Sequence, residues 1–149
     1  MDIIASNDAP DPKLVFLNNG KGHFTEACTF GSPNWTTRYV TLADLNGDGY
    51  PDIVVANRGD YLDPVEGKSG KGHKVPTPSF VCFNDGKGHF PDGVAVPTES
   101  ATSIVAADLD GDGALDLFVP HRDGLECLMV NLFLMLAHRC SVGPFVHYH

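Results

Sequence analysis

The sequence predicts an all-β fold, a partial β-propeller of about two to three four-stranded antiparallel blades followed by an irregular or short helical C-terminal tail. An Asp/Gly-rich run occurs twice, as DLNGDGYPD at residues 44–52 and DLDGDGALD at residues 108–116. A second phrase also occurs twice, as LNNGKGHF at residues 17–24 and FNDGKGHF at residues 83–90. Apolar and β-branched residues beside these phrases are strand-like. Strand groups that repeat in tandem at roughly 50-residue spacing are typical of propeller blades.

In chain order, the first predicted strand starts at Asp2, because DIIASN there matches DIVVAN at Asp52. Residues 14–17 form an apolar strand that runs into the first Asn-Gly turn, which predicts a hairpin. Residues 39–43 and 53–56 are expected as strands on the two sides of the first Asp/Gly-rich run. The repeating unit is therefore strand A, Asp/Gly-rich loop, strand B, connection, strand C, tight turn and strand D.

The spacing of the phrases divides the chain into blades and a tail. Residues 1–124 are expected to hold the blades, with an insertion at residues 58–79 whose Gly, Lys, Pro and Asp content is typical of a surface loop. Residues 125–149 lack the hairpin phrase, so we expect a replacement strand C with an apolar extension, or a short buried helix. The expected blades are a partial one, a full one and a second partial one, at residues 2–30, 38–92 and 103–124.

Each Asp/Gly-rich run has oxygen-bearing side chains at its positions 1, 3, 5 and 9. Its position 7 residue can offer only a backbone carbonyl. A hard cation such as Ca²⁺ takes about six to eight oxygen ligands, so one run can supply most of a shell and about two ions per chain are expected. The glycines permit the positive φ angles that such a turn needs. The predicted ligands are Asp44, Asn46, Asp48, the Tyr50 carbonyl and Asp52 in the first run, and Asp108, Asp110, Asp112, the Ala114 carbonyl and Asp116 in the second.

Two other kinds of turn share part of this pattern. An EF-hand needs a Glu at position 12 and a helix on each side, whereas position 12 is Val55 or Val119 and the flanks are strand-like. A turn that binds no metal would also use Asp, Asn and Gly, which are common turn residues. Such a turn would not need carboxylates at positions 1, 5 and 9 of both copies, so the pattern favours calcium.

Three segments resemble FG-GAP/VCBS-type repeats: ADLNGDGYPDIVVA at residues 43–56, ADLDGDGALDLFV at residues 107–119 and NDGKGHF at residues 84–90. Such repeats build the calcium-bearing propellers of integrin α chains and of many bacterial and eukaryotic extracellular proteins. The resemblance covers residues 2 to about 124. It implies an extracellular, cell-surface or periplasmic location and a part in recognition, with cell adhesion as one example. Propellers of this kind close a ring of several blades, so the chain looks like a fragment or a frameshifted product. Its open edges would need further blades or another chain. A self-standing open assembly, whose apolar tail covers one edge, is the alternative.

Composition disfavours several classes of function. The net charge of −9 argues against nucleic acid as a partner, because phosphate binding needs a basic face. No apolar run of about 18 or more residues predicts a membrane span. The start MDIIAS lacks the basic and apolar regions of a signal peptide. Four cysteines without a CxxC pair leave the redox compartment open. No catalytic set of side chains stands out, so we expect a module that is not an enzyme.

A ligand surface is expected opposite the Asp/Gly-rich loops. In a propeller the A–B and C–D turns lie on one face, whereas the B–C and D–A connections lie on the other. The second face would gather Trp35, Arg38, Arg58 and Tyr61, whose aromatic and charged groups could hold a protein or carbohydrate ligand. The alternative is that Trp35 packs between blades and that Arg58 pairs with a nearby carboxylate. A second class of function remains open, namely an accessory propeller region of a secreted hydrolase or other enzyme whose catalytic domain is absent here.

Overall fold

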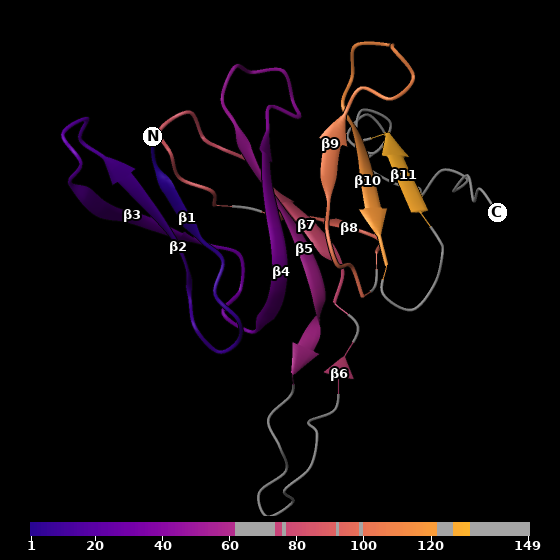
Figure 1. Ribbon diagram of the computed structural model, residues 1–149, viewed down its shortest axis with the longest axis horizontal. Helices are drawn as coiled ribbons and strands as arrows, with labels where there is room; N and C mark the ends of the chain where they lie inside the picture. The colour runs from indigo at the N-terminus through magenta and orange to yellow at the C-terminus, as the bar shows by residue number, and fades with distance from the viewer. Residues whose placement is uncertain (62–73, 76, 92, 99, 122–126, 132–149) are drawn as a thin grey trace, which may run out of the picture.

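The computed structural model describes residues 1–61, 74–75, 77–91, 93–98, 100–121 and 127–131 (Figure 1). These residues form eleven β-strands in three sheets, and all strand pairs are antiparallel. The prediction of an all-β fold made of antiparallel blades is confirmed. Nothing in the described part of the chain is a helix of the length and apolar character that crossing a membrane requires.

The first sheet has the order β1 (Ile3–Ala5), β2 (Lys13–Asn18) and β3 (Phe24–Phe30), which correspond to strands B, C and D of the repeating unit. The first hairpin phrase forms the turn between β2 and β3. Asn18 organises this turn, because its Oδ1 accepts the N–H groups of Gly20 at 2.9 Å and Gly22 at 3.2 Å. Both glycines have φ near +80°, a region that favours glycine.

The middle sheet holds a full set of four strands. Its order is β4 (Trp35–Ala43), β5 (Asp52–Tyr61), β7 (Ser79–Cys82) and β8 (Gly93–Val96), which correspond to strands A, B, C and D. A two-residue strand, β6 (Lys74–Val75), pairs with the far end of β5. The remainder of the predicted insertion lies largely outside the described residues.

The third sheet has the order β11 (Cys127–Asn131), β10 (Asp116–Pro120) and β9 (Val105–Ala107). Strand β11 belongs to the segment that lacks the hairpin phrase, and it pairs with β10 over five residue pairs. A helix over residues 127–131 is therefore wrong, and the replacement strand C is the alternative that the structure has there. The rest of the predicted tail lies outside the described residues.

Strand β5 is buried on both of its faces. Ile53 and Val55 pack toward the first sheet, whereas Val54 and Ala56 pack toward the third, and all four side chains are 0% exposed. Successive side chains of a strand point to opposite faces, so a strand between two sheets is apolar at every position. The cluster between the first and middle sheets also contains Val15, Phe30, Trp35, Cys82 and Phe90. The cluster between the middle and third sheets also contains Val81, Val96, Ala101, Ile104, Leu117 and Val119.

Buried polar groups link the strands around Asn57 of β5 and around Lys13 of β2. Asn57 accepts the hydroxyl of Thr37 on β4 at 2.9 Å and donates its amide to the Pro78 carbonyl at 3.0 Å, just before β7. The Lys13 side chain is buried in the interface between the first and middle sheets, where its Nζ donates to the Trp35 carbonyl at 2.9 Å. These bonds satisfy polar groups that would be costly to bury unpaired. Sequence patterning did not predict either arrangement.

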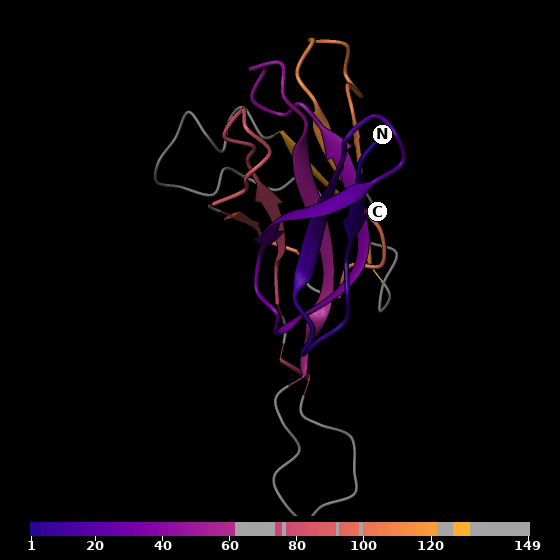
Figure 2. The ribbon, with the colours of Figure 1, turned by 90° about the vertical axis from the view of Figure 1, so that its left-hand side faces the viewer.

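The connections divide between two ends of the molecule. The loops at residues 44–52 and 108–116 lie at the same end, which is the top of both views, whereas β6 lies at the opposite end (Figures 1 and 2). The first loop joins β4 to β5 and the second joins β9 to β10, and both pairs of strands have this joined end on the same side of the molecule. The two Asp/Gly-rich loops are therefore neighbours in space although they are far apart in the sequence.

Candidate metal centre

The first Asp/Gly-rich loop, at residues 44–52, joins β4 to β5 as a turn built around Asp44. The Oδ1 atom of Asp44 accepts the N–H groups of Gly47 at 2.8 Å and Asp48 at 3.1 Å, and its Oδ2 accepts that of Gly49 at 2.9 Å. Gly47 and Gly49 have φ of 73° and 88°, which residues with a side chain rarely adopt. The turn thus forms because one carboxylate satisfies three backbone donors while the glycines accept left-handed φ.

The second loop, at residues 108–116, repeats this arrangement between β9 and β10. Asp108 accepts the N–H of Gly111 at 2.7 Å through Oδ1 and that of Gly113 at 3.0 Å through Oδ2. The two glycines have φ of 80° and 90°. The loops differ at positions 3, 7 and 8, so the common turn follows from the residues that they share.

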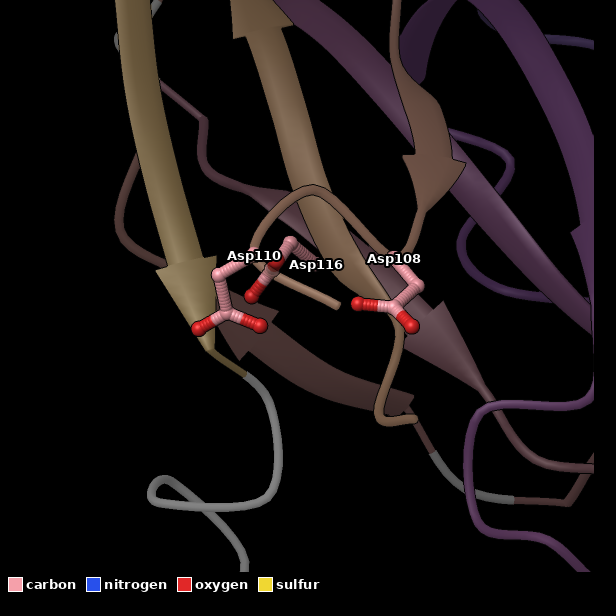
Figure 3. Close-up of side chains that lie close together, drawn as sticks. All are labelled: Asp108, Asp110 and Asp116. Carbon is pink, nitrogen blue, oxygen red and sulfur yellow. The ribbon is translucent and has the colours of Figure 1, made fainter. Parts of the chain in front are cut away.

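Three carboxylates of the second loop converge on one point. Asp108, Asp110 and Asp116 each offer an oxygen, and these oxygens all lie within 4.8 Å of one another. In Figure 3 the Asp116 carboxylate lies between those of the other two residues. Like charges held this close repel one another, and a divalent cation offsets that repulsion. Carboxylate oxygens are also the ligands that Ca²⁺ takes, so the donor set fits this ion.

The carboxylate at position 9 is buried in both loops, whereas Asp108 and Asp110 are exposed. Asp52 accepts the Leu45 N–H at 2.9 Å, and Asp116 accepts the Leu109 N–H at 3.2 Å, in each case through Oδ2. The pKa of Asp52 is raised above its usual range, chiefly because the carboxyl is buried. The N–H donors of Asn84 and Leu45 lower this pKa in part, and the nearby charges of Asp48 and Asp44 raise it further. A cation at this position would favour the ionised carboxylate.

Position 5 plays the same part in both loops. Asp48 accepts the Tyr50 N–H and Asp112 accepts the Ala114 N–H, each through Oδ1 at 2.8 Å. In the first loop the amide of Asn46 also donates to Asp48 Oδ2 at 2.8 Å. Among the described residues, Asp108, Asp110 and Asp116 are the group of three that comes together closely enough for one ion. The carbonyl oxygens of positions 7 remain predicted ligands.

Asn84 contacts the first loop, and sequence reasoning did not connect them. This residue opens the turn between β7 and β8, and its N–H donates to Asp52 Oδ1 at 2.9 Å. The equivalent bond joins Asn18 and Asp2 in the first sheet, also at 2.9 Å. A signal was present in the sequence, since both hairpin phrases have Asn at this position, and Asp2 lies directly before β1 as Asp52 lies at the start of β5.

The four residues expected on the ligand surface have different environments. Trp35 is 9% exposed and stacks on Phe80, with ring centroids 4.1 Å apart and an interplanar angle of 17°. It is therefore part of the core between the first and middle sheets, because burying its large apolar ring is favourable there. Arg38 is exposed, with its Nη1 3.9 Å from Asp8 Oδ2. Arg58 is half-buried, and its Nε has no hydrogen-bond acceptor among the described residues. The side chain of Tyr61 lies outside the described residues.

Comparison with known proteins identifies a repeat family. A family model described as an FG-GAP-like repeat matches residues 1–55 and 76–119, and a second, described as an FG-GAP repeat, matches residues 40–73. No curated protein and no solved structure matches the chain. The matched ranges of the first model contain both Asp/Gly-rich loops and both hairpin phrases.

Proposed function

Because the chain belongs to the FG-GAP repeat family, we propose that it is a calcium-stabilised recognition module in which each Asp/Gly-rich loop holds one Ca²⁺ ion. FG-GAP repeats are generally non-catalytic modules, and they are typical of extracellular or surface proteins. The observation that carries the proposal is the convergence of Asp108, Asp110 and Asp116, whose oxygens lie within 4.8 Å of one another. The first loop supports it with the same backbone turn around Asp44.

The ion has a structural part in this proposal. It would be held by the side chains at positions 1, 3, 5 and 9 of each loop and by the carbonyls of Tyr50 and Ala114. Bound calcium supplies positive charge between carboxylates that otherwise repel one another. Asp44 and Asp108 hold the two turns in shape. The buried Asp52 and Asp116 anchor each loop to the strand that follows it.

The recognition part of the proposal concerns the end of the molecule opposite the calcium loops. A protein or carbohydrate ligand is the expected class of partner, and nucleic acid is not, because the chain has a net charge of −9. Arg38 and Arg58 remain candidate contacts on that side, whereas Trp35 is assigned to the core. The open edges of the partial blades would be covered by further blades or another chain.

Isothermal titration calorimetry tests the calcium proposal on protein stripped with a chelator. We expect about two ions per chain, because each loop presents most of one calcium shell. Asp44→Ala and Asp108→Ala should each reduce this to about one, since each removes a position 1 ligand and the turn that it organises. Asp8→Ala removes an exposed carboxylate outside the loops and should leave two. Unchanged uptake in both loop variants, or no uptake by the parent chain, would overturn the proposal.

The two sites should differ in affinity. The second loop has a carboxylate at position 3, Asp110, where the first has the neutral amide of Asn46. Ligand charge tunes calcium affinity, so Asn46→Asp should tighten the first site and Asp110→Asn should weaken the second, each roughly tenfold. Titration of each variant in a chain whose other loop is disabled measures one site at a time. Affinities that do not respond to either exchange would contradict the assignment of position 3 as a ligand.

A further inference from the structure

We propose that Asn84 is a positioning residue of the first calcium site, and that it couples this site to the C–D turn at residues 84–90. The inference rests on the proposed function, because it concerns how the chain prepares Asp52 for an ion. Asn84 lies 32 residues beyond Asp52 in the sequence, yet its N–H donates to Asp52 Oδ1 at 2.9 Å. The position 9 carboxylate of the loop is thus held partly by a different turn.

Asp52 is restrained at both of its oxygens. Leu45, inside the loop, donates its N–H to Oδ2 at 2.9 Å, while Asn84 donates to Oδ1. The side chain is also 0% exposed. An ionised carboxylate has about four lone-pair sites, so two N–H donors leave capacity for a cation. Asp52 is therefore oriented before an ion arrives, which lowers the entropy cost of binding.

The Asn84 side chain joins the loop to the turn by a second route. Its Nδ2 donates to the carbonyl of Pro51 at 3.0 Å, directly before Asp52. Its Oδ1 accepts the N–H groups of Gly86 at 3.0 Å and Gly88 at 3.1 Å. One amide therefore holds the end of the calcium loop with its nitrogen and the C–D turn with its oxygen. A shift of the calcium loop would therefore displace the C–D turn, and a shift of the turn would displace the loop.

Tyr50 adds a packing contact between the same two segments. A Cβ placed on Gly86 would lie 3.2 Å from the Tyr50 ring, so the ring rests against the backbone of the turn. Tyr50 also stands at position 7, whose carbonyl is a predicted ligand. In the second loop position 7 is Ala114, and the sequence has no third copy of the hairpin phrase. Among the described residues the second loop has no equivalent contact, so it offers an internal reference for this coupling.

The first sheet contains the same Asp–Asn bond at Asp2, which lies outside the two Asp/Gly-rich loops. Asn18 donates its N–H to Asp2 Oδ1 at 2.9 Å, and its Oδ1 organises the turn through Gly20 and Gly22. Because the bond recurs in two sheets, it is a property of paired strands B and C, and the calcium loop of the middle sheet is attached to it. This makes Asn18 a matched control for Asn84.

Calorimetric calcium titration of chains that carry Asp108→Ala tests the coupling, because the first loop is then the site that is measured. Asn84→Ala keeps the backbone N–H that donates to Asp52, but it removes the side-chain bonds to Pro51, Gly86 and Gly88 that hold this N–H in place. It should therefore weaken calcium binding about tenfold, as substitutions behind a metal ligand commonly do. Asn18→Ala removes the equivalent turn-capping bonds in the first sheet and should leave the calcium affinity within twofold of its parent. A general loss of stability would affect both variants, whereas a positioning role affects Asn84→Ala alone.

Amide hydrogen exchange on the unsubstituted chain provides a readout that needs no variant. Calcium should slow exchange at Gly86 and Gly88 severalfold and leave Gly20 and Gly22 unchanged, because binding at one site stabilises whatever is coupled to it. Equal calcium affinity in the Asn84→Ala and Asn18→Ala chains, or equal changes in exchange at the two pairs of glycines, would overturn this inference alone. If the Asp108→Ala chain takes up no calcium, the proposed function of the first loop fails as well.

Discussion

Replacing Trp35 with Ala is expected to lower the free energy of unfolding by about 3–5 kcal/mol, the range for truncating a buried Trp or Phe. Trp35 lies in the cluster between the first and middle sheets and stacks on Phe80. Its ring also lies against Gly31, where an added Cβ would come within 2.2 Å of it. The substitution therefore leaves a cavity that rigid strands on two sheets cannot close. Urea unfolding measures the change, followed by far-ultraviolet circular dichroism because the variant lacks the tryptophan needed for a fluorescence signal.

Tyr39→Ala is the matched control for Trp35→Ala. Tyr39 lies on the same strand, β4, but is 46% exposed, so its truncation should cost well under half as much. Comparable losses for the two variants would argue against a core position for Trp35. The comparison also bears on recognition, since a Trp35→Ala effect on ligand binding that followed the loss of stability would reflect unfolding and not a lost contact.

Removing calcium should lower stability by about 3–5 kcal/mol when free calcium was at about ten to a hundred times the dissociation constant of both sites. Each site then contributes about 1.4–2.7 kcal/mol, because the ion binds the folded loop and not the unfolded chain. For a domain of this length the midpoint of thermal unfolding should fall by roughly 10 °C. Thermal melts with calcium, and with excess chelator, measure this difference.

The double variant Asp44→Ala, Asp108→Ala should melt at the same temperature with and without calcium. Magnesium should stabilise the parent chain less than calcium does, because it demands near-octahedral geometry and sheds water reluctantly. An unchanged melting temperature on chelation of the parent would remove the structural role of the metal. Stabilisation that persists in the double variant would place the relevant ions elsewhere.

The strands could be predicted because the repeat and the local patterns agree with one another. Residues 53–56 were expected as strand B and lie within β5, and residues 14–17 lie within β2. Strand β4 is longer than expected, since it begins at Trp35 and not at Tyr39. Its first residues pair with the extension of β5 through two register shifts. Such pairing depends on where β5 ends, and residues 35–38 alone do not indicate it.

The candidate site was predictable at its side chains and not at its backbone contacts. Oxygen side chains at fixed spacing indicate a metal loop, and three of the predicted ligands, Asp108, Asp110 and Asp116, lie close together. The contact between Asn84 and Asp52 uses a backbone N–H, which every residue except proline carries, so the residue types in a single repeat do not mark it. Its signal in the sequence is the recurrence of Asn and Asp at the same positions of both repeats. The environment of Trp35 depends on how two sheets pack, and a lone aromatic residue in a connection does not indicate whether it faces core or solvent.

The burial of β5 on both faces shows that the number of sheets packed against a strand sets its hydrophobic pattern. A strand between two sheets is apolar at every position, whereas a strand with one neighbouring sheet alternates. In β10, Leu117 and Val119 are buried, but the residue between them is Phe118, which is 37% exposed and pairs with the exposed Val105. Strand β10 is thus apolar on both faces, as expected for a strand between two sheets, although a sheet packs against only one of its faces among the described residues. The face that carries Phe118 is where a further sheet would pack.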